Sequence, residues 1–173
     1  AQWLNTATAK EIVKVLRDYG EERYANRIAR AIKAESVTTT GQLADIITTA
    51  CPPNKEHKHP ATRSFQALRI FINRELEQLQ QVLTQTLNIL APHGRLVVIS
   101  FHSLEDRIAK RFMRDNARGD KFPINLPVTV KQLNPKLRII NKPIRASQAE
   151  INSNPRSRSA ILRVAELTKF NFK

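Results

Sequence analysis

The sequence predicts an α/β fold that follows a small all-helical segment, and three observations support this. Leu96 to Ile99 is a continuous apolar run, which is typical of a strand buried on both faces inside a parallel sheet. A long segment with helical periodicity precedes this run, and a short polar turn and a helix start follow it directly. The order helix, strand, turn, helix is that of α/β proteins.

Residues 1–58 predict a compact bundle of three short helices. Capping boxes at Thr8–Glu11 and Thr39–Gln42 predict the starts of the first and third helices. The second helix fits residues 21–34, after a natural stop at Gly20. Because a bundle of this size buries little apolar surface, we expect it to be marginally stable alone.

Residues 61–90 predict one long helix, because apolar residues recur at every third or fourth position. This stripe consists of Phe65, Leu68, Ile72, Leu76, Leu79, Leu83, Leu87 and Leu90. A coiled-coil strand is an alternative, but the turn at Pro92–Gly94 leads straight into the apolar strand, which favours packing across a sheet. Residues 54–60 are expected to form a polar linker in front of this helix.

The chain after the apolar strand predicts one further helix and two short strands. Ser103 and Asp106 have capping-box spacing, so this helix is expected to begin near Leu104. The expected elements are, in order, a helix over 104–116, an irregular basic loop over 117–136, a strand over 137–140 that Pro143 ends, a helical turn capped by Ser147, and a strand over 160–167. Such a sheet is incomplete. We therefore expect the chain to be the C-terminal part of a longer protein.

The net charge of +14 is spread unevenly along the chain. Residues 1–105 carry 13 Lys and Arg against 10 Asp and Glu, whereas residues 106–173 carry 16 against 5. This imbalance favours a polyanionic partner, most often nucleic acid, over a basic surface without a partner. No run approaches the roughly 20 apolar residues of a membrane helix. With one cysteine, Cys51, and no signal-peptide pattern, a cytoplasmic protein without disulfides and without a membrane partner is expected.

The polar turn after the apolar run is the expected place for chemistry, since ligands of open α/β sheets bind at the carboxyl ends of strands. His102 lies there beside Ser100, Ser103 and Glu105. The structural alternative is that Ser103 caps the helix and His102 supports it. A hydrolase triad is not expected, because Ser103 is not in a G-x-S-x-G motif. The other histidines lack metal-ligand spacing, so no metal site is predicted.

Residues 154–159 place two arginines beside hydroxyl groups, a combination that binds phosphate. The alternative is a loop that is salt-bridged to the protein itself. Trp3 can stack on a base or pack in a core. The four glycines are isolated from one another, so these residues contain no glycine-rich loop for a nucleotide.

Seven blocks together resemble the MraW (RsmH) type of S-adenosylmethionine-dependent methyltransferase and cover nearly the whole chain. In order they are Trp3–Asn5, Tyr19–Arg23, Ala29–Ile32, Lys58–Arg63, Phe65–Ile70, Ser100–Arg107 and Asn154–Ser159. The resemblance implies a partial class I, Rossmann-like methyltransferase sheet with an inserted helical domain. Residues 1–58 would be that insertion, and residues 59–173 the C-terminal part of the methyltransferase domain. The cofactor-binding residues would lie upstream of residue 1, so this chain alone is expected to be inactive.

The resemblance also implies a reaction, which is methylation of the exocyclic N4 amine of a cytidine in small-subunit ribosomal RNA. Ser100, His102, Ser103 and Glu105 are then the expected catalytic residues, with His102 or Glu105 accepting an N4 hydrogen. The expected substrate-binding residues are Trp3, Tyr19, Phe101 and Asp106, with Arg63, Arg69, Arg156 and Arg158 as phosphate contacts. The small ribosomal subunit is the expected partner, and a homodimer is one candidate assembly. The rival interpretations are a non-catalytic basic RNA-binding module and a purely structural partner-binding piece.

Overall fold

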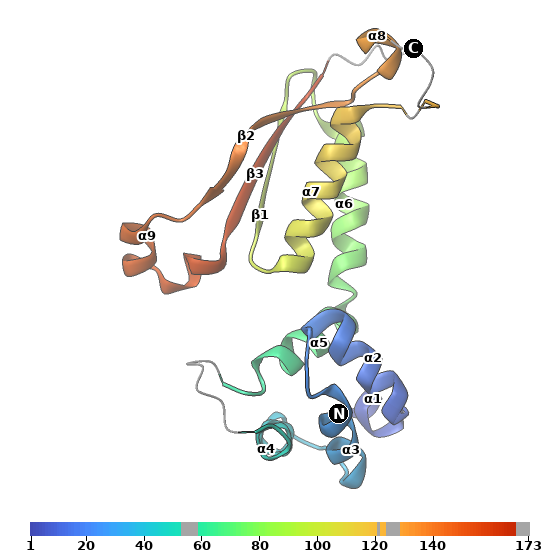
Figure 1. Ribbon diagram of the computed structural model, residues 1–173, viewed down its shortest axis with the longest axis vertical. Coiled ribbons are helices and arrows are strands. Elements are labelled where there is room, and N and C mark those ends of the chain that lie inside the picture. Colours follow the sequence, from blue (N-terminus) through green and yellow to red (C-terminus); the bar gives the residue numbers. More distant parts are fainter. Residues whose placement is uncertain (53–58, 121, 124–128, 169–173) are drawn as a thin grey trace. The chain divides into compact units, whose positions relative to one another are not determined.

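The structure is a computed structural model that describes residues 1–52, 59–120, 122–123 and 129–168. The chain forms two compact units, Ala1–Glu75 and Leu76–Lys173 (Figure 1). The division lies later in the chain than the expected boundary after residue 58, because the helix over Thr62–Asn73 belongs to the first unit. Of the expected polar linker, residues 54–58 lie outside the described part. A helix that could span a bilayer is absent from the described ranges.

The first unit contains five helices among its described residues, packed around one apolar core. They are α1 (Gln2–Thr6), α2 (Ala9–Gly20), α3 (Ala25–Ala34), α4 (Thr40–Ala50) and α5 (Thr62–Asn73). Residues on the inward faces of α2, α3 and α4, among them Ile12, Ile28 and Ile47, are fully buried. α5 closes this core with Ala67 and Leu68. The expected three-helix bundle is therefore completed by the short helix α1 before it and by α5, which has 12 residues, after it.

The capping residues of the first unit lie where the sequence predicts them. The Thr8 backbone N–H donates to the Glu11 carboxylate over 2.7 Å, and the Glu11 N–H returns a bond to the Thr8 hydroxyl. Thr39 likewise caps α4 by accepting from the Gln42 N–H. The capping box at Thr8 is therefore confirmed. At Thr39 only the cap is confirmed, because the Gln42 side chain accepts from the Thr38 N–H and not from the Thr39 N–H.

The expected start of the second helix near residue 21 is wrong. Glu21 adopts the left-handed conformation, with φ of 49°, and closes α2, so α3 begins only at Ala25. Gly20 is the last residue of α2, where a Cβ would lie 2.7 Å from the Arg63 carbonyl oxygen. Glycine is needed there for the close approach of α5.

The expected long helix over 61–90 is interrupted at Arg74, whose φ is 53°. α5 ends at Asn73, and α6 spans Glu75–Ile89. The apolar stripe is continuous in sequence, but its residues pack in two separate hydrophobic cores. Leu68 packs in the first unit, whereas Leu83 packs in the second. Periodicity alone does not reveal a change of partner along one stripe.

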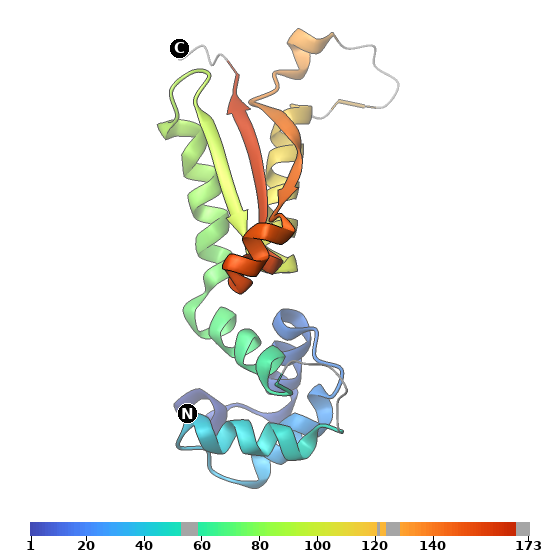
Figure 2. The same cartoon turned by 90° about the vertical axis from the view of Figure 1, so that its left-hand side faces the viewer.

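The second unit is a three-stranded sheet with two long helices on one side (Figure 2). After α6 it comprises β1 (Arg95–Ser100), α7 (Ser103–Arg118), α8 (Val130–Leu133), β2 (Leu137–Arg145), α9 (Gln148–Ser153), the 3-10 helix η1 (Pro155–Ser159) and β3 (Ile161–Leu167). The strand order is β1-β3-β2, and both pairings are antiparallel. The core between the sheet and the helices contains Leu83, Leu96, Met113, Leu137 and Leu167.

The expectation that Val97–Ile99 is buried on both faces of a parallel sheet is wrong for this chain. β1 lies at the edge of the described sheet and is antiparallel to β3. Leu96 is buried, but Val97 and Ile99 are 52% and 53% exposed. Both α6 and α7 cover the same face, so alternate residues of β1 point to the uncovered side.

β2 is longer than expected and continues through Pro143 to Arg145. Its pairing with β3 is irregular between Ile140 and Ile144, and Asn141 in between has a φ of 60°. An edge strand tolerates proline at such an irregularity, because no ladder hydrogen bond is lost there. The expected cap at Ser147 is confirmed, since its hydroxyl accepts from the Glu150 N–H.

Replacing Leu83 by alanine is expected to destabilise the second unit by about 2–5 kcal/mol, because its buried side chain fills the core under the sheet. Hydrogen exchange of the β3 backbone amides measures this loss. The neighbouring Val82, which is 56% exposed, supplies the control. Val82→Ala should change protection by no more than about 0.5 kcal/mol. Equal loss of protection in both variants would contradict this packing.

Candidate functional site

The turn between β1 and α7 is closed by a capping box built from His102 and Glu105. His102 is the N-cap of α7, and its Nδ1 accepts from the Glu105 N–H at 3.4 Å. The Glu105 carboxylate accepts in return from the N–H groups of Phe101 and His102, at 2.9 and 3.4 Å. The expected box of Ser103 and Asp106 is therefore wrong, and Ser103 is the first helical residue. Histidine is outside the group of preferred N-cap residues, so its capping role was missed.

The capping bond decides which tautomer His102 adopts. Because Nδ1 accepts a hydrogen bond, the neutral imidazole carries its hydrogen on Nε2. Nε2 is buried and makes no hydrogen bond within the described residues. It lies 3.3 Å from Glu105 Oε1, which is within ion-pair distance but without the direction of a hydrogen bond. The side chains of His102 and Glu105 therefore face each other in addition to capping the helix.

Glu105 is held as a carboxylate at neutral pH. Burial opposes its ionisation, but the His102 side chain beside it and the hydrogen bond from the Phe101 backbone outweigh burial and lower its pKa below the ordinary value. Oε2 receives both backbone N–H groups. Oε1 receives no backbone donor in the described structure and lies 3.3 Å from Nε2 of His102, so one of its two lone pairs remains for a further hydrogen.

Asp106 forms a two-pronged ion pair with Arg163 in the middle of β3. Arg163 Nε lies 2.7 Å from Oδ1 of Asp106, and Nη2 lies 2.9 Å from Oδ2. The hydrogen bonds from Arg163 lower the pKa of Asp106, against a smaller opposing effect of burial. Asp106 was expected to bind substrate, but in this structure its carboxylate holds the first turn of α7 against the sheet.

The strand register brings the Asn154–Ser159 segment beside this turn. Ser100, which is fully buried, pairs with Ile161, directly after η1 and Ala160. Figure 2 shows η1 at the end of the sheet where β1 ends. Phe101 is 56% exposed at the same end. Two segments more than 50 residues apart in sequence thus form one edge of the unit.

Arg156 and Arg158 are exposed on η1, whereas Ser157 between them is buried. The Ser157 hydroxyl donates to the Asn154 carbonyl and shapes the turn. Neither arginine pairs with a carboxylate in the described part of the chain, which disfavours the alternative of a loop salt-bridged to the protein itself. Both guanidinium groups are therefore available to a phosphate.

The expected substrate-binding residues of the first unit differ in their contacts: two are packed aromatic residues, one arginine is ion-paired and one arginine is exposed. Trp3 and Tyr19 pack near Phe71, with ring centroids 4.7 and 6.2 Å from it. Arg69 forms a fork with Glu75, at 2.9 and 3.1 Å. Arg63 is exposed. These contacts give Trp3 and Tyr19 a packing role that does not require a base.

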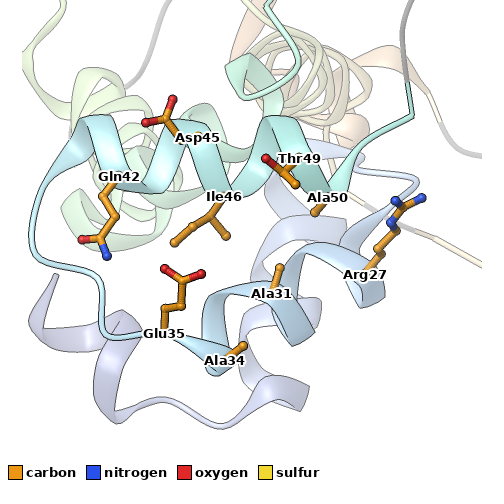
Figure 3. Close-up of a pocket in the computed structure, with 9 residues that line it drawn as sticks. All are labelled: Arg27, Ala31, Ala34, Glu35, Gln42, Asp45, Ile46, Thr49 and Ala50. Atoms are coloured by element: carbon orange, nitrogen blue, oxygen red, sulfur yellow. The ribbon is translucent and has the colours of Figure 1, made fainter.

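The first unit also contains a groove between α3 and α4 that sequence reasoning missed (Figure 3). It encloses about 600 Å³ and is lined by Arg27, Ala31, Ala34, Glu35, Gln42, Asp45, Ile46, Thr49 and Ala50. The apolar residues of this groove, such as Ala31 and Ile46, recur at helical spacing in the sequence, and this spacing also predicts an ordinary helix core. Carboxylates at Glu35 and Asp45 on its rim make it unsuited to phosphate.

The described residues provide no place for a metal and no cradle for a nucleotide-type cofactor. Clusters of His, Cys, Asp and Glu that could hold a metal are absent from them. Gly94 closes a tight turn onto Ala91, and Gly119 lies against Leu133. Neither glycine belongs to a loop that follows a strand, as a phosphate or ribose loop does.

Removing Arg163 should raise the pKa of Asp106 toward its ordinary value. Because the folded pKa is lowered, the stabilisation by this pair is present at neutral pH and is lost as the pH falls through the folded pKa. A carbon-detected NMR titration of Asp106 in wild type and Arg163→Met measures the shift. Arg163→Met should also cost about 1.5–3 kcal/mol of stability.

Arg114→Met provides the matched control for that experiment. Arg114 pairs with Asp115 at 2.9 Å on an exposed part of α7, the helix that also contains Asp106. This pair should contribute less than about 1 kcal/mol. An Asp106 pKa that does not respond to Arg163→Met would show that the fork is not formed in solution.

Comparison of the sequence with models of known protein families gives a match along almost the whole chain. Residues 1–168 match the model of the MraW methylase family. The match includes the helical unit, the turn with His102 and Glu105, and the η1 segment with its two arginines. Members of this family are S-adenosylmethionine-dependent methyltransferases. With all but its last five residues matched, this chain belongs to the MraW methylase family.

Proposed function

We propose that this chain is the C-terminal part of an enzyme that methylates the exocyclic N4 amine of a cytidine in small-subunit ribosomal RNA. The family match over residues 1–168 is the observation that carries this proposal. The clustering of His102, Glu105 and the η1 arginines at one end of the sheet supports it. The cytoplasm, where ribosomal RNA is made into subunits, is the corresponding location.

The architecture that accompanies this function is a class I methyltransferase sheet with a helical insertion. In the proposal, the helical unit serves substrate recognition, and β1, β3 and β2 form one side of a larger sheet. Two features support the larger sheet. β1 pairs with β3 only, among the described strands, and the exposed Val97 and Ile99 leave an apolar surface that further protein would cover.

S-adenosylmethionine would supply the methyl group from its sulfonium. The residues described here do not fit this cofactor, because their glycines are isolated and no glycine-rich loop follows β1. In the proposal, the cofactor is therefore held by protein outside this chain, and the chain alone does not turn over. In the proposal, this chain contributes the pocket for the target cytosine and the contacts with the RNA phosphates.

The amine of cytosine is a poor nucleophile, because its lone pair is delocalised into the ring. The enzyme must turn the base out of its stack and aim the nitrogen at the methyl group, so much of the rate comes from positioning. A fixed acceptor for an N4 hydrogen stabilises the positive charge that develops on the nitrogen.

Glu105 suits this acceptor role better than His102 does. Its carboxylate is ionised at neutral pH, and Oε1 receives no backbone donor in the described structure. His102, in contrast, uses Nδ1 for the cap and carries its hydrogen on Nε2, so its ring has no lone pair left to accept. We assign Glu105 as acceptor and His102 as the residue that positions it.

Glu105→Gln is expected to lower methyl transfer by about a hundredfold in the complete enzyme, because a neutral amide replaces the carboxylate. The fold should persist, since glutamine also serves in a capping box. Mass spectrometry of nucleosides from small-subunit RNA measures N4-methylcytidine in cells that carry each variant. Loss of the gene should remove that nucleoside, and its persistence would overturn the proposed function.

His102→Asn separates capping from direct chemistry, because asparagine is a favoured N-cap without an imidazole. This variant should keep most of the activity, whereas His102→Ala should lose stability and activity together. His93→Ala, at the exposed turn before β1, is the matched control and should leave methylation unchanged. An inactive His102→Asn beside an active Glu105→Gln would transfer the acceptor role to His102.

A further inference from the structure

A narrow apolar slot lies between α7 and the irregular part of β2, and its lining contains no residue of the His102 turn. It encloses about 160 Å³ and is lined by Lys110, Met113, Arg114, Ile139, Asn141, Pro143, Arg163 and Val164. This volume is well below the roughly 300–1,000 Å³ of sites that hold a whole small molecule. The slot therefore suits a single ring system that belongs to a larger ligand.

The slot exists because β2 departs from regular pairing. The register with β3 breaks between Ile140 and Ile144, where Asn141 is left-handed and Pro143 follows. As a result Ile139 is 50% exposed, although it lies on the face of the sheet that α7 covers. Met113 is buried and forms the floor. Its polarisable thioether makes favourable contacts with an aromatic ring.

The lining charges of the slot are all positive. Lys110 and Arg114 are one turn apart on α7, so both flank the opening on the same face of the helix. Arg163 is held by Asp106 through two hydrogen bonds, which fix the plane of its guanidinium. A fixed guanidinium plane stacks on a base at little cost in side-chain entropy.

The carboxylates near the slot neutralise only part of this charge. Asp106 pairs with Arg163, and Asp115 forms an exposed pair with Arg114. Lys110 makes no hydrogen bond with the residues described, although it contributes to lowering the pKa of Asp106. A ligand with a flat ring and negative charge next to it matches this arrangement.

We propose that the slot holds one unpaired base of the RNA, with an adjacent phosphate on Lys110. This inference rests on the RNA substrate of the proposed function and adds a second contact outside the reaction site. Such a contact would fix the register of the strand, because a base in the slot sets how far the target cytidine is from the His102 turn. The α3–α4 groove does not compete for this role, since its rim carries carboxylates.

Filling the slot should weaken RNA binding. We expect Ile139→Trp to raise the dissociation constant for a single-stranded pyrimidine heptamer by about five- to tenfold, which corresponds to the loss of one stacked base. Fluorescence anisotropy of the labelled RNA with this chain measures the constant. Ile89→Trp, at a 78% exposed isoleucine on α6, is the matched control and should change the constant by less than twofold.

A second experiment changes the RNA instead of the protein, so its wild-type measurement does not depend on whether a variant folds. Abasic nucleotides are placed at each position of the heptamer in turn. In wild type, one or more positions should show a five- to tenfold loss, and Ile139→Trp should show no further loss at those positions. Lys110→Ala should reduce the slope of log affinity against log salt by about one.

The outcomes separate the slot from the proposed function. Salt-dependent RNA binding with equal abasic losses in wild type and Ile139→Trp would overturn the slot and leave the methyltransferase proposal standing. A wild-type chain that binds no RNA would overturn the slot and the RNA-binding role of this chain. The nucleoside assay of methylation would then decide independently whether the proposed reaction survives.

Discussion

The ion pair between Asp106 and Arg163 is the constraint on which the second unit depends. It joins the first turn of α7 to the centre of β3 across 57 residues of sequence, with the two side chains only 16–17% exposed. The capping box of His102 and Glu105 lies immediately before this anchor. Without this ion pair, the start of α7 would be held by its capping box and by buried residues such as Leu104, with no side-chain bond to β3. Precise placement of Glu105 thus depends on a contact made by another strand.

The same strand explains why two distant motifs form one site. β3 pairs with β1 along its length, so the residues just before β3 lie beside the residues just after β1. η1 therefore places Arg156 and Arg158 at the end where Phe101 and His102 leave the sheet. A sheet order of β1-β3-β2 puts the last strand in the centre, which makes the C-terminal hairpin part of the site.

Several helix caps could be predicted from neighbouring residues, although the box at Ser103 and Asp106 was wrong by one position, whereas features that depend on distant partners could not be predicted. The caps at Thr8, Thr39 and Ser147 follow from local spacing. The break at Arg74 was missed, because a non-glycine residue takes the left-handed conformation inside an unbroken apolar stripe. β1 was misread because an apolar run shows that both faces suit apolar contact, not that both are covered in this chain.

The net charge indicates a candidate surface for a polyanion only after the arginines and lysines that pair with carboxylates are left out of the count. Arg163 and Arg69 are bound by carboxylates and act within the fold, so their charge is already opposed. Arg156, Arg158 and Lys110 form no ion pair within the described ranges, and all three belong to the basic second half of the chain. The proposed phosphate contacts of this unit are therefore a few side chains on α7 and η1. The groove of the helical unit, in contrast, carries the carboxylates of Glu35 and Asp45 and is unsuited to phosphate.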